Sequence, residues 1–259
     1  MKTSKNKLKY VFGPVYSWRL GYSLGIDLTY SKRKVCNFNC IYCQLGRTVR
    51  YTDKRSIFVP TKDIIRELKL ITDVKTDYIT LSGCGEPTLA KNLGAVIESI
   101  KKIRKEPVAV ITNSYLICCK DVQRDLMKAD KILFKLDGCS DEILKKVNNP
   151  VHYITFENMF QCLKKFRKAY KGHFALQIMF VKENKKCAGE LAKLAAEIGA
   201  DEIQINTPTR QNESKPLSRI EINKIKSYFY GRKIISVYDK PYKDTVARGY
   251  GNIKKRHPN

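Results

Sequence analysis

The sequence contains no apolar run long enough to cross a bilayer, since a crossing helix needs about 20 consecutive apolar residues. Its first residues, MKTSKNKLKY, are basic and lack the apolar stretch that follows in a secretory signal peptide. Internal repeats and low-complexity linkers are also missing. These absences exclude an integral membrane protein and a repeat array. They predict a soluble, cytoplasmic chain with no membrane partner.

Acidic residues are scarce: 25 Asp and Glu stand against 50 Lys and Arg, so the formal net charge is +25. A charge of this size attracts polyanions such as RNA and DNA. The lysines are nevertheless scattered along the chain, and a codon bias toward A and T also enriches Lys, Ile, Asn and Tyr together. Charge alone therefore leaves nucleic-acid contact and a compositional origin equally open.

The 9 cysteines of this 259-residue chain are too sparse for a small secreted disulfide scaffold. A reducing compartment fits this usage better. Most of the thiols are then expected to act as small apolar residues. Cys162 and Cys187 are predicted to have that role.

Apolar runs of strand length alternate with helical patterns along most of the chain. Strands are expected at residues 23–30, 77–83, 107–113, 131–138, 173–181 and 201–207. Helices are expected at 61–71, 92–105, 156–166 and 187–198, with a short one after Ser140. A capping-box pattern at 218–221 opens a final helix, a strand is expected at 232–238, and a basic tail ends the chain.

Six strand–helix units in about 200 residues imply an α/β fold with parallel strands and right-handed crossovers. An open sheet and a partial barrel both accommodate them, whereas a complete eight-unit barrel needs more chain. The expected organisation is an N-terminal segment 1–22, a core 23–210, and a C-terminal part 211–259 with a helix, a strand and the basic tail.

The chemically unusual segments all follow predicted strand ends. In chain order they are CNFNCIYC, SGCGEPTL, TNS, LDGCS, VKEN and NTPTR. Ligands of parallel α/β folds bind at the carboxyl ends of the strands, so the six segments are expected to lie on one rim. The sequence therefore predicts a single site.

Cys36, Cys40 and Cys43 have C-x3-C-x2-C spacing on one loop, where three thiolates can serve one inorganic centre. A structural zinc site needs a fourth ligand, but no His lies in the loop and the next cysteines are Cys84 and Cys118. A four-iron cluster can instead bind three irons by thiolate and leave the fourth iron open.

SGCGEPTL combines two glycines with a carboxylate and a proline. Gly83 and Gly85 allow the backbone to bend and a ligand to approach closely. Glu86 places a carboxylate at the rim, suited to an ammonium group, and Pro87 ends the strand. The segment by itself is also typical of a tight turn between a strand and a helix.

CNFNCIYC followed by SGCGEPTL resembles the radical S-adenosylmethionine (SAM) superfamily, and the resemblance covers about residues 11–210. It implies a partial (β/α)6 barrel. FGPVYSWRLGYSLGIDL, CNFNCIYCQLGRT, KLDGCSDEILKKVNNP and QINTPTR are similar to a narrower group, the enzymes related to tRNA wyosine synthesis (4-demethylwyosine synthase).

The resemblance implies that Cys36, Cys40 and Cys43 ligate a [4Fe–4S] cluster, whose open iron binds the amine and carboxylate of SAM. An electron from a reductant such as flavodoxin or ferredoxin would then cleave SAM and generate a 5′-deoxyadenosyl radical. The sequence assigns no catalytic side chain toward the substrate. Cys84 and Cys139 lie on the rim, where a buried thiol and a substrate contact both remain open.

The resemblance also implies the side chains that hold SAM. Glu86 would bind the amine, Tyr42 would lie against the adenine, and Asn113 would contact the ribose or carboxylate. Asp137 ends the fourth strand on the same rim, with Lys135 on its face by strand alternation. The expected cofactor-binding set is Tyr42, Gly83, Gly85, Glu86, Asn113 and Asp137.

The narrower resemblance makes tRNA the first macromolecule to test as a substrate. The sequence departs from wyosine-forming enzymes in having no cysteine before Cys36 for a second cluster, and no lysine can be assigned to their pyruvate capture. An activating or maturation enzyme that acts on a protein or small metabolite is a second hypothesis. A basic RNA-binding protein with a zinc-stabilised cysteine loop is a third.

Overall fold

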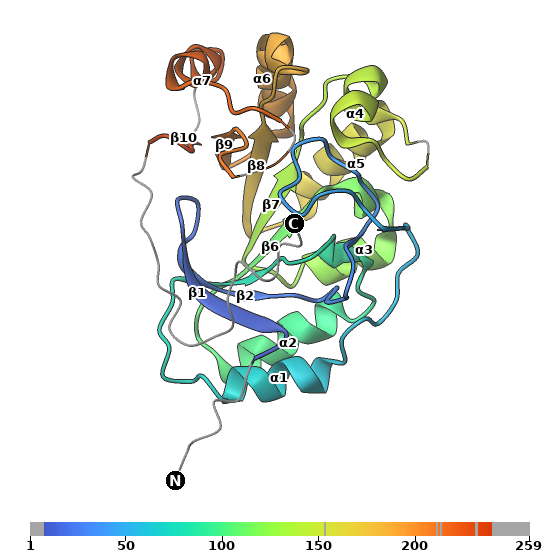
Figure 1. Ribbon diagram of the computed structural model, residues 1–259, viewed down its shortest axis with the longest axis vertical. Coiled ribbons are helices and arrows are strands. Elements are labelled where there is room, and N and C mark those ends of the chain that lie inside the picture. Colours follow the sequence, from blue (N-terminus) through green and yellow to red (C-terminus); the bar gives the residue numbers. More distant parts are fainter. Residues whose placement is uncertain (1–7, 153, 211, 213, 231–232, 240–259) are drawn as a thin grey trace.

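The computed structural model describes residues 8–152, 154–210, 212, 214–230 and 233–239 (Figure 1). Its main sheet has the strand order β1-β2-β5-β6-β7-β8-β9-β10. All neighbours from β2 to β10 pair in parallel, and β1 pairs antiparallel with β2. The strands are β1 (Val11–Ser17), β2 (Gly21–Ile26), β5 (Tyr78–Leu81), β6 (Val108–Thr112), β7 (Lys131–Lys135), β8 (His173–Met179), β9 (Glu202–Asn206) and β10 (Lys233–Ser236).

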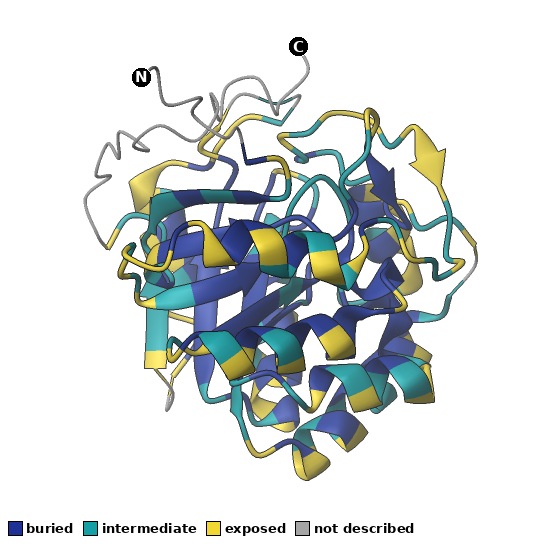
Figure 2. Ribbon diagram, turned by 90° about the horizontal axis from the view of Figure 1, so that it is seen from below, coloured by how far each residue is buried: buried dark blue, intermediate teal, exposed yellow. Residues whose placement is uncertain are grey.

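Helices connect the parallel strands and lie along the outer side of the curved sheet (Figure 1). Figure 2 shows them with buried residues toward the sheet and exposed residues outward. The α-helices are α1 (Thr61–Lys69), α2 (Leu93–Ile103), α3 (Lys120–Leu126), α4 (Asp141–Asn148), α5 (Phe156–Ala169), α6 (Ala188–Ile198) and α7 (Arg219–Lys226). Three short 3-10 turns are η1 (Pro87–Leu89), η2 (Tyr115–Cys118) and η3 (Lys185–Cys187). The six expected strand–helix units and the partial (β/α)6 barrel are confirmed.

The two faces of the sheet differ because alternate residues of a strand point to opposite sides. The outer face is apolar and packs under the helices, through residues such as Ile79, Val110, Phe134, Leu176 and Ile205. On the inner face, a small apolar cluster of Leu20, Ala109, Leu133 and Ala175 stands beside polar side chains. The helices thus pack against the outer face of the sheet. The inner face is not covered by these helices and is available for contacts with other groups.

Two expected helix ends are confirmed by their capping contacts. At the start of α7, the Ser218 side chain accepts from the Glu221 N–H, while Glu221 accepts from the Ser218 N–H. At the end of α6, Gly199 adopts φ 74°, a left-handed conformation that costs glycine little.

The first strand of the sheet was not expected from the sequence. Residues 11–17, VFGPVYS, contain Gly13 and Pro14, which are both uncommon inside a strand. The structure accommodates them at the sheet edge, where the register shifts between Phe12 and Val15. Part of the expected N-terminal segment is therefore an edge strand, and β2 begins at Gly21 rather than at residue 23.

Three further elements were also missed, two of them strands beside the cysteine loop. Val35–Cys36 forms β3, which pairs in parallel with β4 (Arg50–Tyr51) in a separate two-stranded sheet. Cys36 thus ends a short strand instead of lying in an irregular loop. The other omission is α3, which follows η2.

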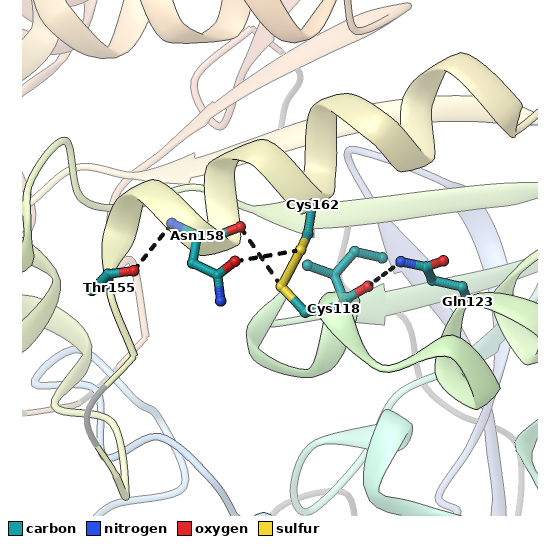
Figure 3. Close-up of a disulfide and its surroundings, with 6 residues drawn as sticks. Cys118, Gln123, Thr155, Asn158 and Cys162 are labelled. Atoms are coloured by element: carbon teal, nitrogen blue, oxygen red, sulfur yellow. Dashed lines mark hydrogen bonds between the residues drawn. A yellow bond between two sulfur atoms is a disulfide. The ribbon is translucent and has the colours of Figure 1, made fainter.

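The prediction that Cys162 is an isolated apolar thiol is wrong. Cys162 on α5 forms a disulfide with Cys118 at the end of η2, and Asn158 contacts both sulfurs (Figure 3). The two residues are 44 positions apart in the sequence, and nothing in their spacing indicates a pair. The packing of η2 against α5 brings them together. Cys187 is unbonded, as expected.

The predicted strand at 232–238 is confirmed as β10, which extends the parallel sheet beyond β9. The predicted basic tail, residues 248–259, lies outside the described residues. Among the helices of the described part, none is long and apolar enough to cross a membrane.

Candidate active site

The three cysteines of the C-x3-C-x2-C segment lie at the carboxyl ends of the parallel strands, and all three are unbonded. Cys36 ends β3, which is held to the segment that follows β5 by the bridge between Val35 and Gly85. Cys40 and Cys43 are joined by a turn in which the Cys43 N–H donates to the Cys40 carbonyl at 3.1 Å. The cysteine segment is therefore anchored to the rim at which it was expected.

Cys36 is linked to the buried Glu86 through one asparagine. The Asn113 side-chain amide lies 3.8 Å from the Cys36 sulfur, and the Asn113 backbone N–H donates to Glu86 Oε2 at 2.8 Å. The same amide donates to Asn37 at 2.6 Å. Burial, and then the nearby Glu86 carboxylate, raise the pKa of the Cys36 thiol well above its usual value. Metal coordination offsets both effects, because it favours the thiolate.

Glu86 is only 3% exposed and its carboxylate is held by four hydrogen bonds. Oε1 accepts from the Thr88 N–H, the Thr88 hydroxyl and the Thr112 hydroxyl, at 3.0, 2.6 and 2.7 Å. Among the described residues, Oε2 accepts from the Asn113 N–H alone. Burial raises the pKa of Glu86, and the hydrogen bonds oppose that rise. The carboxylate is thus a fixed group within the site, and less exposed than the sequence suggested.

Cys40 is linked to a second buried carboxylate, again through one asparagine. The Asn148 side-chain amide lies 3.4 Å from the Cys40 sulfur and 2.9 Å from Asp137 Oδ2. Burial, and then the adjacent Cys43, raise the pKa of Cys40 to about 11, although the Asn148 contact lowers it. Two of the three cysteines therefore receive an amide donor that is anchored, in turn, by a carboxylate.

Tyr42 belongs to the network around Asp137. Its hydroxyl donates to Asp137 Oδ2, and Lys135 Nζ lies 4.8 Å from the centre of its ring. Lys135 also pairs with Asp137 Oδ1 at 3.3 Å, so the shared face expected from strand alternation is confirmed. Burial, and then the Asp137 charge, raise the pKa of Tyr42 well above its usual value. The phenol is thus a neutral donor at neutral pH, directed away from solvent.

The two glycines of SGCGEPTL are needed for close packing within the protein itself. A Cβ at Gly83 would lie 2.4 Å from the Asp27 carboxylate, and one at Gly85 would lie 1.8 Å from the Val35 carbonyl oxygen. Asp27 is fully buried and accepts from the Cys84 N–H at 3.1 Å. The groups nearest to these glycines are therefore the Asp27 carboxylate and the Val35 carbonyl, which belong to the protein itself. A contact of the glycines with SAM stays a prediction.

Sequence reasoning missed three polar residues of this region. Asp27 directly follows β2, Asn37 lies between two of the cysteines, and Asn148 ends α4. Each of them is almost fully buried. Asn37 lies in CNFNCIYC, which follows a predicted strand, and could have been found by that signal. Asp27 was hidden because the predicted strand 23–30 ran past the observed end of β2 at Ile26, and nothing near Asn148 in the sequence points to Cys40.

Whether the cysteines suit an iron–sulfur cluster can be judged from their arrangement. Within the described part of the chain, no three His, Cys, Asp or Glu side chains are gathered closely enough to hold a single metal ion. A mononuclear ion needs its ligands to converge on one point. A four-iron cluster binds each thiolate at a different corner, so its ligands are further apart. Three unbonded thiols on one segment, with N–H groups directed at two of the sulfurs, fit the three-thiolate donor set of such a cluster.

The comparisons with known proteins agree with this donor set. Residues 30–195, well over half of the chain, match the family described as the radical SAM superfamily. The chain belongs to the radical SAM superfamily. As a radical SAM protein it is an iron–sulfur enzyme, and its family implies SAM and an iron–sulfur cluster as cofactors.

Two relatives of this radical SAM enzyme differ in name, and only the second name states a reaction. A UPF0026 protein of Synechocystis sp. is 41% identical over 81% of this chain and 78% of its own length. A probable GTP 3′,8-cyclase of Saccharolobus solfataricus is 24% identical over 69% of this chain and 56% of its own length.

Streptococcus suis SuiB bound to S-adenosylmethionine has a similar fold, with a TM-score of 0.62 and 15% sequence identity. The match covers 90% of this chain but 49% of SuiB, so the chain spans about half the length of that structure. At this identity the likeness concerns the fold alone, and it supports the partial barrel.

Proposed function

We propose that this chain cleaves SAM reductively at a [4Fe–4S] cluster ligated by Cys36, Cys40 and Cys43, and that it acts on a tRNA nucleoside. The observation that carries the cluster assignment is the pair of asparagine bridges, which tie two of three unbonded cysteines to buried carboxylates. When bound, the cluster and SAM supply a 5′-deoxyadenosyl radical. The protein's own residues position the cofactor and exclude water.

Glu86 is the proposed anchor for the methionyl amine of SAM. Its Oε1 already accepts three hydrogen bonds, whereas Oε2 accepts one and retains capacity for a second donor. Asn113 bridges Glu86 and Cys36, so an ammonium on Oε2 would lie close to the cluster ligand. Tyr42, Gly83, Gly85 and Asp137 are the other proposed cofactor contacts.

Replacing Glu86 by glutamine is expected to weaken SAM binding while leaving the iron content unchanged. A charge-assisted contact contributes about 1.5–3 kcal/mol, which corresponds to a loss of roughly 10- to 150-fold in affinity. Calorimetric titration of the anaerobically reconstituted Glu86→Gln protein measures this. Glu98→Gln, a half-exposed surface change on α2, should bind SAM like the wild type. Equal affinity of the Glu86 variant and the wild type would remove Glu86 from the site.

The choice of a tRNA nucleoside rests on the net charge of +25 and on the narrower resemblance to wyosine-synthesis enzymes. A small nucleotide is a second candidate, because one relative is named a probable GTP 3′,8-cyclase. A protein or a peptide is a third. Each candidate substrate predicts that a different added compound accelerates SAM cleavage: tRNA, a small nucleotide such as GTP, or a protein or peptide.

Addition of tRNA from the source cell is expected to increase 5′-deoxyadenosine formation above the slow rate that dithionite supports alone. If tRNA is the substrate, binding should weaken steeply as salt rises, because phosphate contacts release counterions. Product analysis with tRNA, with GTP and with neither compound separates the candidates. A rate raised by GTP alone would favour the small nucleotide, and a rate that neither raises would move the substrate to another class. No product under any condition would count against radical chemistry.

A further inference from the structure

Cys36, a proposed cluster ligand, is separated from solvent by one short strand. Within the described part of the chain, β4 pairs with β3 alone, so its other edge is open. Tyr51 lies opposite Cys36 in the register of this pair, and the Thr52 N–H donates to the Cys36 carbonyl at 3.1 Å. Both residues of β3 are buried, whereas both residues of β4 are exposed. Since adjacent strands are about 4.8 Å apart, a partner that lies on β4 is one strand away from a cluster ligand.

β4 lies on the outer side of β3, away from the main sheet. The bridge between Val35 and Gly85 attaches β3 to the segment after β5, so β3 lies between the main sheet and β4. The proposed SAM contacts Glu86 and Asp137 follow the main-sheet strands β5 and β7. A substrate must reach SAM on that side, whereas an electron needs only to reach the cluster. The β4 side is therefore suited to electron delivery.

Exposed cations follow the β3–β4 ribbon. Arg50 is on β4, Arg33 is two residues before β3, and Lys54 is three residues beyond β4. All three are exposed, and among the described residues none of them forms an ion pair with a carboxylate. Asp53, the carboxylate of the same segment, lies 3.7 Å from His152. The edge of the ribbon is thus a positive surface whose charges are available to an acidic partner.

Two large apolar side chains stand among these cations. Val49 is 56% exposed and Tyr51 is 36% exposed. The Tyr51 hydroxyl donates to the Asn149 carbonyl, and the Arg50 guanidinium lies 5.4 Å from the centre of the Phe58 ring. Protein–protein interfaces are enriched in aromatic side chains and arginine, with charged groups at the rim. We call the following residues the β4 surface: Arg33, Val49, Arg50, Tyr51 and Lys54.

We propose that the β4 surface docks an acidic one-electron carrier protein, which supplies the electron for SAM cleavage. Carboxylates of the carrier pair with the three cations, and its apolar centre packs on Val49 and Tyr51. One electron passes from the reduced carrier to the oxidised cluster, and no bond forms or breaks in this step. The position one strand from Cys36 favours a carrier over RNA. This inference rests on the proposed function, because it requires the cluster at the three cysteines.

Calorimetric titration of the anaerobically reconstituted protein with a flavodoxin, and separately with a ferredoxin, both of acidic net charge, tests the surface. The wild type should bind at least one carrier at a single saturable site. Arg33→Gln/Arg50→Gln should weaken that binding at least about 5-fold at low salt and less at high salt, because salt screens exposed charges. Lys54→Glu, outside both strands, should weaken it at least about 3-fold.

The matched control is Arg66→Gln/Lys193→Gln, which removes two charges from exposed positions on α1 and α6. It should change carrier binding less than about 2-fold. Circular dichroism verifies that each variant is folded. Equal losses in the two double variants would reduce the effect to net charge and overturn the proposal, as would the absence of saturable binding by both carriers. Loss of tRNA binding in Arg33→Gln/Arg50→Gln, with carrier binding intact, would assign the surface to RNA instead.

The rate of 5′-deoxyadenosine formation separates docking from chemistry. Dithionite is a small reductant that needs no docking surface, so Arg33→Gln/Arg50→Gln should keep its rate with dithionite within about 2-fold of the wild type. With the reduced carrier, the same variant should be at least about 5-fold slower at low carrier concentration. Carrier binding that depends on the β4 surface, without any product from dithionite, would sustain the surface and reject the proposed function. Product from dithionite, with carrier binding unchanged in the variant, would do the opposite.

Discussion

Anaerobic reconstitution of the Cys40→Ala variant is expected to yield a protein without the iron–sulfur cluster, whereas the wild type should bind about four irons per chain. Cys40 is one of three proposed ligands, and the Asn148 amide that contacts its sulfur cannot replace a thiolate. Two thiolates cannot hold three irons. Iron and sulfide analysis, with the visible absorption of the cluster, measures the loss.

The control for this experiment is Cys119→Ala. Cys119 is unbonded and exposed, and it lies outside the cysteine segment. Cys162 is unsuitable as a control, because its replacement would break the disulfide with Cys118. Cys119→Ala should retain a full cluster that is lost on exposure to oxygen. A full cluster in Cys40→Ala would reject the assignment of the three cysteines.

The barrel could be predicted from the sequence because each of its strands is a short apolar run followed by turn residues. The runs at 107–113, 131–138 and 201–207 became β6, β7 and β9 with boundaries shifted by at most three residues. The edge strand β1 was missed because Pro14 interrupts its pattern. Edge position, which removes the demand for an N–H donor on one side, is a property of the sheet and cannot be recognised locally.

The candidate site was predicted in its position but only partly in its contacts. The rule that ligands bind at strand ends brought Cys36, Glu86, Asn113 and Asp137 to one rim. In the structure Asn113 contacts both Cys36 and Glu86, whereas Asp137 is linked through Asn148 to Cys40. The link from Asn148 to Cys40 spans 108 positions and depends on how α4 packs beside the cysteine segment. Contacts of that kind are set by tertiary packing, which no local pattern encodes.

The same limit explains the glycines of SGCGEPTL. Their sequence context indicates close approach by a partner, and close approach is what the structure shows. The partners nearest to them are the Asp27 carboxylate and the Val35 carbonyl, from two other elements. A glycine therefore predicts that something lies near, while the fold decides what it is.

Replacement of Glu202 by glutamine is expected to lower the free energy of unfolding by about 3–5 kcal/mol, because it removes the charge of a buried carboxylate that pairs with the buried Lys131 ammonium. Glu202 is 1% exposed at the start of β9 and accepts from Lys131 on β7 at 3.1 Å and from Lys233 on β10 at 2.9 Å. His173 on β8 lies 3.6 Å away. One carboxylate thus joins four adjacent strands at the amino-terminal edge of the sheet. Urea denaturation at pH 7 measures the difference.

The pH dependence of this difference follows from the pKa of Glu202. Burial raises that pKa, but the adjacent His173, the contacts from Gln204 and Lys233, and the charge of Lys131 outweigh burial and bring it well below its ordinary value. A carboxyl group whose pKa is lower in the folded state stabilises the protein above its unfolded pKa, near 4.3, and loses that contribution as the pH falls toward the folded value. The gap between wild type and Glu202→Gln should therefore be full at pH 7 and shrink below about pH 4. Glu190→Gln, at a half-exposed position on α6, should cost less than about 0.5 kcal/mol. If Glu202→Gln costs no more than Glu190→Gln, this carboxylate does not hold the four strands together.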